Sequence, residues 1–264
     1  MKIASYQMDL TPGNPIENRR RVQEWVETVC RDGEVDVLVL PEMWTTAYTL
    51  PTLREIVKAD QGTTEPFLQN LAKTFNVNLV AGSIAVEEEG SIYNRSIIMN
   101  REGKIVHTYD KMHLVPMLDE HIYLEGGKSS VRVFELDGKK MGVIICYDLR
   151  FPELVRTLAL EGAEVVFVVA EWPEARASHW EVLQQARAIE DQVYIVSCNR
   201  VGAYNGVQFA GRSMVINPWG DILVKASSTE EETIRVDLDL NEVQRIRKEV
   251  PVFSSRVPKL YKLD

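Results

Sequence analysis

The stretch Met141–Glu153, MGVIICYDLRFPE, joins an apolar run, a cysteine and the start of a helix, and it decides the fold prediction. Its first six residues are mostly apolar and β-branched, which is typical of a buried strand. Pro152 suits the first turn of a helix, so the chain turns from strand to helix at Cys146. A nucleophile at such a turn projects from the rim of a sheet. Cys146 is therefore a candidate nucleophile, and a small packed core residue is the alternative.

Similar patterns recur along the 264 residues. They predict further strands at 35–40, 78–84, 92–99, 104–110, 131–136, 165–170, 193–198, 213–217, 221–224 and 233–238. Helical spacing predicts helices at 18–29, 65–75, 153–161 and 179–191, the last with Val182, Leu183, Ala186 and Ile189 on its apolar face. Strand–helix units and hairpins are mixed, so we expect a layered α/β protein with mixed sheets. No linker or repeat interrupts the pattern, and residues 1–264 are expected to form one domain.

Charge and composition exclude several classes of protein. The 30 Lys and Arg residues against 39 Asp and Glu residues give a net charge of −9, and no basic stripe for nucleic acid occurs. The three cysteines are far apart, which predicts free thiols in the cytoplasm. No signal peptide and no apolar run long enough to cross a membrane is found. Zinc-site spacing and dinucleotide-binding motifs are missing too, so we expect no metal and no cofactor.

Two further residues follow predicted strands and are candidate partners for the cysteine. A free thiol is only a few per cent thiolate at neutral pH, so it needs a base or a neighbouring cation. Glu42 follows the strand at 35–40, and a buried carboxylate there can act as the base. Lys111 follows the strand at 104–110, and a buried ammonium can stabilise a thiolate and an oxyanion. The alternatives are a surface carboxylate and a solvated lysine.

Three segments together resemble the nitrilase, or carbon–nitrogen hydrolase, superfamily. They are LPEM at 40–43, YDKMHL at 109–114 and ICYDLRFPE at 145–153. The resemblance implies a four-layer α-β-β-α sandwich and a catalytic triad of Glu42, Lys111 and Cys146 that needs no cofactor. It also implies a second catalytic glutamate, which is Glu120 with Glu125 as the alternative. A homodimer is implied as well, with a C-terminal tail from about 250 to 264 that is expected to cross to the partner subunit or to fold back.

Within the superfamily, the chain looks most like the ω-amidase branch. The matching stretches are 179–188, 217–220 and 246–253. That branch removes the side-chain amide of 2-oxoglutaramate or 2-oxosuccinamate as ammonia, in bacteria alongside methionine salvage. The alternatives are a related amidase or N-carbamoylase, acting on deaminated glutathione or an N-carbamoyl amine, and a non-catalytic binding subunit. A nitrile-hydrolysing enzyme is less favoured by these stretches.

The resemblance also suggests which groups contact the substrate. The backbone N–H of Tyr147 is expected to stabilise the oxyanion of a tetrahedral intermediate. The substrate carboxylate needs a cation or other hydrogen-bond donors, for which Arg150, Arg176 and the Tyr48 hydroxyl are the candidates. For Arg150 the alternative is an ion pair with Glu153 or another loop carboxylate.

Overall fold

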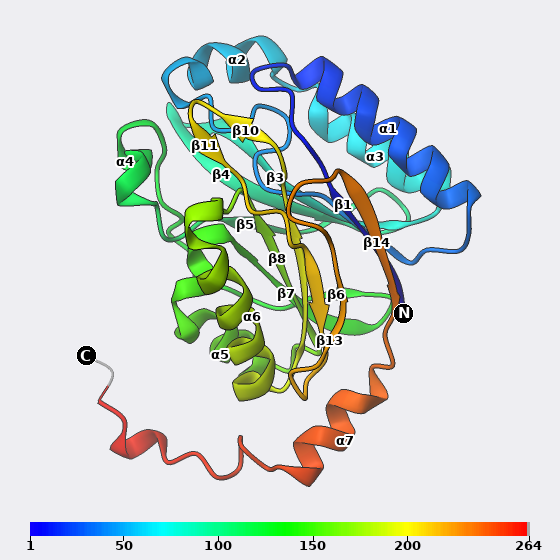
Figure 1. The fold of residues 1–264 in the computed structure, drawn as a ribbon, viewed down its shortest axis with the longest axis vertical. Helices are drawn as coiled ribbons and strands as arrows, with labels where there is room; N and C mark the ends of the chain where they lie inside the picture. The colour runs from blue at the N-terminus through cyan, green and yellow to red at the C-terminus, as the bar shows by residue number, and fades with distance from the viewer. Residues whose placement is uncertain (263–264) are drawn as a thin grey trace.

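Two six-stranded mixed sheets form the centre of the computed structural model, which describes residues 1–262 (Figure 1). In spatial order the first sheet contains β14 (Glu232–Asp237), β1 (Lys2–Gln7), β2 (Val37–Val39), β3 (Asn78–Glu88), β4 (Ser91–Met99) and β5 (Ile105–Asp110). The second contains β13 (Ile222–Lys225), β12 (Met214–Ile216), β9 (Tyr194–Asn199), β8 (Val165–Ala170), β7 (Lys139–Ile145) and β6 (Phe134–Leu136). Strands β1 to β3 and strands β7 to β9 pair in parallel, and the remaining pairs are antiparallel.

Helices cover the outer faces of both sheets. Helices α1 (Pro15–Arg31) and α3 (Thr64–Phe75) lie on the first sheet, and α5 (Pro152–Leu160) and α6 (Ala177–Asp191) lie on the second (Figure 1). One buried apolar cluster includes residues of both sheets. Strand β8 is buried along its whole length, as a parallel strand covered on both faces must be. The predicted four-layer α-β-β-α sandwich is therefore confirmed.

The ends of three strands position the site. Strand β2 leads into Glu42, β5 into Lys111 and β7 into Cys146. Strand β5 pairs antiparallel with β4, so the residue that follows β5 lies beside Asn94 of β4. The carbonyl of Asn94 accepts a hydrogen bond from the backbone N–H of Lys111 at 2.9 Å. Helix α5 begins at Pro152, one residue before the predicted range of 153–161, and Pro152 occupies its first turn as expected.

The buried face predicted for the helix at 179–191 is wrong. Helix α6 leaves Val182 63% and Ile189 54% exposed, and it turns Trp180, Gln184 and Arg187 inward instead. Each inward polar side chain has a partner for part of its polar group: Gln184 donates to the Trp180 carbonyl at 2.9 Å, and Arg187 donates to the Leu149 carbonyl at 2.9 Å. Oε1 of Gln184 and Nε of Arg187 have no hydrogen-bond partner in the described chain. Buried polar side chains with partners are tolerated in a core, so helical spacing of apolar residues alone does not identify the inner face.

The strand predicted at 131–136 starts only at Phe134. The backbone N–H of Val133 donates to the Glu161 side chain at 3.1 Å instead of to a strand. Strand β1 was not predicted, although it pairs with both β2 and β14. Also unpredicted are α2 (Leu53–Asp60), α4 (Glu120–Tyr123), α7 (Asn241–Glu249), the hairpin of β10 (Ala203–Tyr204) with β11 (Val207–Gln208), and the 3-10 turns η1 (Leu50–Thr52), η2 (Pro116–Leu118), η3 (Cys146–Arg150), η4 (Glu174–Arg176) and η5 (Pro258–Leu260).

The C-terminal tail leaves α7 and runs apart from the sandwich (Figure 1). Leu260 in this tail is 77% exposed. The last two residues of the predicted tail, 263 and 264, lie outside the described part of the chain. Within residues 1–262, no helix combines the length and the apolar character needed to cross a membrane.

Candidate active site

Glu42, Lys111 and Cys146 come together at the ends of their strands. The Nζ atom of Lys111 lies 3.1 Å from Oε1 of Glu42, and both side chains are fully buried. Cys146 is buried beside them, close enough that both charges act on its thiol. The structure thus brings together three residues that are far apart in the sequence.

Hydrogen-bond donors surround the Glu42 carboxyl group. Oε1 accepts from the Tyr48 hydroxyl at 2.6 Å, from Asn94 Nδ2 at 2.8 Å and from Lys111. Oε2 accepts the backbone N–H of Glu171 at 2.7 Å. Four donors match a carboxylate, which only accepts hydrogen bonds. Glu42 is therefore a buried, hydrogen-bonded carboxylate, and the alternative of a surface carboxylate is wrong.

Lys111 is held between two carboxylates. Its Nζ atom donates to Glu120 at 2.8 and 3.1 Å and to the Tyr48 hydroxyl at 2.9 Å. Burial alone would lower the pKa of Lys111, but the charges of Glu120 and Glu42 raise it above its usual value. Lys111 is therefore a permanent ammonium. Its second carboxylate is Glu120, whereas the alternative Glu125 has a half-exposed side chain.

Cys146 occupies a strained backbone position. Its φ of +49° lies in the left-handed region, which a residue with a side chain seldom adopts. The residue ends the run of β7 and starts η3, as the predicted strand-to-helix turn requires. Burial and the negative charge of Glu42 raise the pKa of the Cys146 thiol well above its usual range, although Lys111 lowers it. The sulfur is therefore a neutral thiol at rest, and its proton has to be removed during the reaction.

Asp148 ties the cysteine turn to the lysine loop. Its Oδ2 atom accepts the Ile145 N–H at 3.1 Å and the Tyr109 hydroxyl at 2.7 Å, while Oδ1 accepts the His113 N–H at 3.0 Å. Tyr109 and His113 flank Lys111 in the sequence. Sequence reasoning missed Asp148 as a site residue. Its position three residues after Ile145 was the available signal, because aspartate often accepts nearby backbone N–H groups at turns.

A cavity of about 130 Å³ opens beside Cys146. It is lined by Tyr48, Val115, Met117, Leu118, Cys146, Tyr147, Arg150, Glu171, Trp172, Pro173 and Arg176. At roughly 10–15 Å³ for each water-sized unit, it has room for about ten non-hydrogen atoms. The four predicted contact residues all line it, but the Tyr48 hydroxyl already bonds Glu42 and Lys111. Tyr48 therefore lies at the reacting end of the cavity, which differs from the carboxylate-binding place suggested by the sequence.

Two guanidinium groups lie at this cavity. Within residues 1–262, no carboxylate lies within ion-pair distance of Arg150 or Arg176, and the ion pair with Glu153 is not formed. Arg150 instead stacks over the Trp172 ring at 4.7 Å. Trp172 in turn donates its indole N–H to the Arg176 carbonyl at 2.8 Å. The cavity thus combines a neutral thiol at one end with positive charge that no acid among the described residues neutralises.

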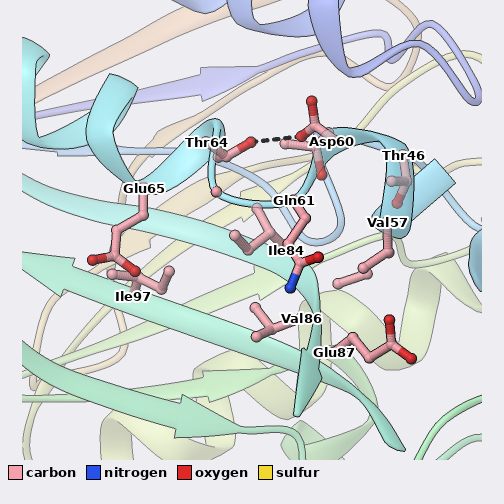
Figure 2. A pocket seen from close by; sticks show the side chains of 13 residues that line it. Thr46, Val57, Asp60, Gln61, Thr64, Glu65, Ile84, Val86, Glu87 and Ile97 are labelled. Carbon is pink, nitrogen blue, oxygen red and sulfur yellow. Dashed lines mark hydrogen bonds between the residues drawn. The ribbon is translucent and has the colours of Figure 1, made fainter. Parts of the chain in front are cut away.

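A second pocket of similar size lies near α2 and α3 (Figure 2). Figure 2 shows Asp60 accepting the hydroxyl hydrogen bond of Thr64, at 3.0 Å. Asp60 also pairs with Arg19 at 2.7 Å, so its charge is already compensated. This pocket contains none of the predicted site residues and no nucleophile. In the described chain, no group of three or more His, Cys, Asp or Glu side chains is arranged to hold a metal ion.

Known proteins resemble this chain in both sequence and fold. The sequence profile described as carbon-nitrogen hydrolase matches residues 2–248. The 2-oxoglutaramate amidase of Bacillus subtilis is 41% identical over 259 residues, which cover 98% of each chain. A Staphylococcus lugdunensis protein named "Hydrolase in agr operon" is 45% identical over 230 residues, covering 87% of this chain and 98% of its own. The crystal structure of Saccharomyces cerevisiae Nit3, described as a member of branch 10 of the nitrilase superfamily, shares 30% identity with a TM-score of 0.89, covering 97% of this chain and 96% of its own.

Proposed function

This chain belongs to the carbon–nitrogen hydrolase family, and on that premise we propose that it is an ω-amidase for 2-oxo acids. Its substrate would be 2-oxoglutaramate or 2-oxosuccinamate, and its products ammonia and a 2-oxo dicarboxylate. The observation that carries this choice is the pair Arg150 and Arg176 in the cavity that holds Cys146, two cations that have no acidic partner in the described part of the chain. A substrate with a carboxylate at the end opposite its amide fits such a cavity. The size of the cavity also suits so small a molecule.

The reaction proceeds through a thioester. Glu42 removes the proton of Cys146 while the sulfur attacks the amide carbon, so the neutral resting thiol becomes a nucleophile only in the presence of substrate. The Sγ–C bond forms, the C–N bond breaks, and Glu42 passes the proton to the departing nitrogen. Glu42 then removes a proton from water, the hydroxide forms a C–O bond with the thioester carbon, and the Sγ–C bond breaks. Glu42 returns its proton to the departing sulfur, which regenerates the thiol and releases the acid. No cofactor takes part in these steps.

Two groups stabilise the oxyanion in both steps. The Lys111 ammonium carries a permanent positive charge, and the backbone N–H of Tyr147 follows the nucleophile directly. Glu120 accepts two hydrogen bonds from Lys111, so we assign it the role of positioning that ammonium. Val115 donates its N–H to Glu120 at 2.8 Å and fixes the carboxyl group in turn.

Ammonia release from a panel of amides tests the proposal. The panel contains 2-oxoglutaramate, 2-oxosuccinamate, deaminated glutathione, N-carbamoylputrescine and a neutral amide without a carboxylate. We expect the two oxo-amides to have the highest kcat/KM. Arg176→Ala should raise KM for them about tenfold and leave KM for the neutral amide unchanged, since one charge-assisted hydrogen bond contributes about 1.5–3 kcal/mol. A higher kcat/KM for a carbamoyl compound, or an unchanged KM in Arg176→Ala, contradicts the proposal.

We also propose that two copies associate through the second sheet's helical layer. The exposed apolar side chains Val182 and Ile189 of α6 lie on its outward face, and Trp219 is 53% exposed. Large apolar side chains gathered on one surface favour a partner. Light scattering after size exclusion should give twice the 30.1 kDa chain mass. Val182→Glu should shift the protein to the monomer, and a wild-type monomer at micromolar concentration contradicts this assignment.

A further inference from the structure

Glu171 is a buried acid for which the proposed reaction has no use. It follows β8 directly, it is 2% exposed, and it lines the cavity beside Cys146. Its backbone N–H donates to Oε2 of Glu42 at 2.7 Å. Its side chain therefore starts next to the group that carries the proton in the reaction.

Among the described residues, one oxygen of the Glu171 carboxyl group has a partner and the other has none. Oε2 accepts from Nη1 of Arg200 at 2.9 Å, and the fully buried Arg200 is itself fixed over the Phe209 ring at 4.2 Å. Oε1 is buried and has no hydrogen-bond partner within residues 1–262. A buried polar atom left unbonded destabilises a fold, so such an atom calls for an explanation. Because Glu171 also lines the cavity, a bound ligand with a hydrogen to donate would satisfy this acceptor.

The two polar atoms of a bound amide make different hydrogen bonds: the oxygen accepts and the nitrogen donates. In the proposed mechanism the carbonyl oxygen accepts from Lys111 and the Tyr147 N–H. The amide nitrogen has two hydrogens to donate, and it must lie near Glu42 to receive a proton as it departs. An acceptor beside Glu42 is therefore in the right place to hold this nitrogen.

We infer that Oε1 of Glu171 accepts a hydrogen bond from the amide nitrogen of the substrate, and so makes the site selective for primary amides. The inference rests on the proposed function, because it uses the orientation of the amide in that mechanism. Glu171 makes and breaks no covalent bond. Burial raises the pKa of Glu171 to about 8 although Arg200 lowers it, and a carboxyl oxygen accepts a hydrogen bond in either protonation state.

The alternative is that Glu171 serves only as the counter-ion of Arg200. A comparison of two substrates that share one acyl group separates these roles. The first is the primary amide that the wild-type protein hydrolyses fastest in the panel, and the second is the methyl ester of the same acid. The ester has no N–H, so loss of an acceptor affects the amide alone, whereas a distorted site affects both substrates.

Glu171→Gln is the main variant. Arg200 will hold the amide oxygen of the new side chain, which turns its NH₂ group toward the nitrogen of the substrate, so that donor faces donor. We expect kcat/KM for the amide to fall about 10- to 100-fold, the value of one lost buried hydrogen bond, while the ester changes less than threefold. Glu174→Gln is the matched control, because Glu174 lies on the same loop but pairs with Arg212 at 3.1 Å and does not line the cavity. It should leave both values unchanged.

Glu171→Asp is the second variant, in case Glu171→Gln misfolds. It keeps the negative charge opposite Arg200, and its shorter side chain moves the carboxyl oxygen away from the amide nitrogen of the substrate. It should lower the amide-to-ester ratio as well. An unchanged ratio in a folded Glu171 variant, whether both substrates lose activity equally or neither does, overturns the inference. A wild-type protein that prefers another panel amide contradicts the proposed substrate but still allows the ratio to be measured on that amide.

Discussion

Replacing Lys111 removes the buried positive charge between Glu42 and Glu120 and should lower the stability of the fold. Lys111→Met leaves Glu42 and Glu120 facing each other in a fully buried site, where Lys111 now lies 3.1 and 2.8 Å from them. Breaking a buried ion pair on one side costs about 3–5 kcal/mol, because a charge is left without compensation. At about 2–4 °C per kcal/mol for a protein near this size, the Tm should fall by roughly 10 °C.

The double variant Lys111→Met with Glu120→Gln should recover much of this loss. Only the Glu42 carboxylate then remains, and it keeps its hydrogen bonds from Tyr48, Asn94 and the Glu171 N–H. Activity should not recover, because both variants lack the oxyanion donor, whose removal costs about 10²- to 10³-fold in kcat. Stability and catalysis are thereby separated at one site.

Thermal unfolding and ammonia release measure the two effects. Lys128→Met is the control, because Lys128 is exposed and pairs with Glu125 at 3.3 Å, so its Tm should change by less than 2 °C. Equal Tm values for the single and double variants would refute the reasoning. So would near wild-type turnover by either variant.

Three further predictions concern the hydrogen bonds and charges around the site and the core. Tyr48→Phe removes the 2.6 Å bond to Glu42 and should lower kcat about tenfold with KM within threefold, as steady-state ammonia release will show. Asp148→Asn places an NH₂ group against backbone N–H donors, so urea unfolding should reveal a loss of about 1–3 kcal/mol, together with slower labelling of Cys146 by iodoacetamide. Burial raises the pKa of Asp191 to about 7 from 3.8, so the folded state binds more protons than the unfolded state between these values. Stability should therefore fall as pH rises from about 4 to 7, by at most about 4 kcal/mol, and urea midpoints of Asp191→Asn should show a flatter profile.

The sequence predicted the parts of this molecule that depend on local pattern. Apolar, β-branched runs located most strands, and Pro152 located the start of α5. The segments around Glu42, Lys111 and Cys146 each follow a strand, and this shared feature led to the site. The sequence could not show which residues from distant parts of the chain contact each other. The Asn94 side chain reaches Glu42 because β4 lies between β3 and β5, and no local pattern around Asn94 indicates that contact.

The inner face of α6 was missed for the same reason. Gln184 is buried with its amide donating to the Trp180 carbonyl of the same helix, and Arg187 donates to the distant Leu149 carbonyl, whereas Val182 and Ile189 face outward. A helical period of apolar residues predicts that those residues face the core. Only the tertiary contacts of the helix show where this prediction is wrong. Glu171 followed a predicted strand as the three main residues do, so the same rule would have identified it.

The thioester at Cys146 is the central claim, and hydroxylamine partitioning tests it most directly. Turnover at a fixed hydroxylamine concentration gives a ratio of acyl hydroxamate to free acid, measured by liquid chromatography with mass detection. A primary amide and the methyl ester of the same acid form one common acyl-enzyme in this account, so the two substrates must give the same ratio. Different ratios from the two substrates, or hydroxamate formed at the wild-type rate by Cys146→Ala, would contradict it.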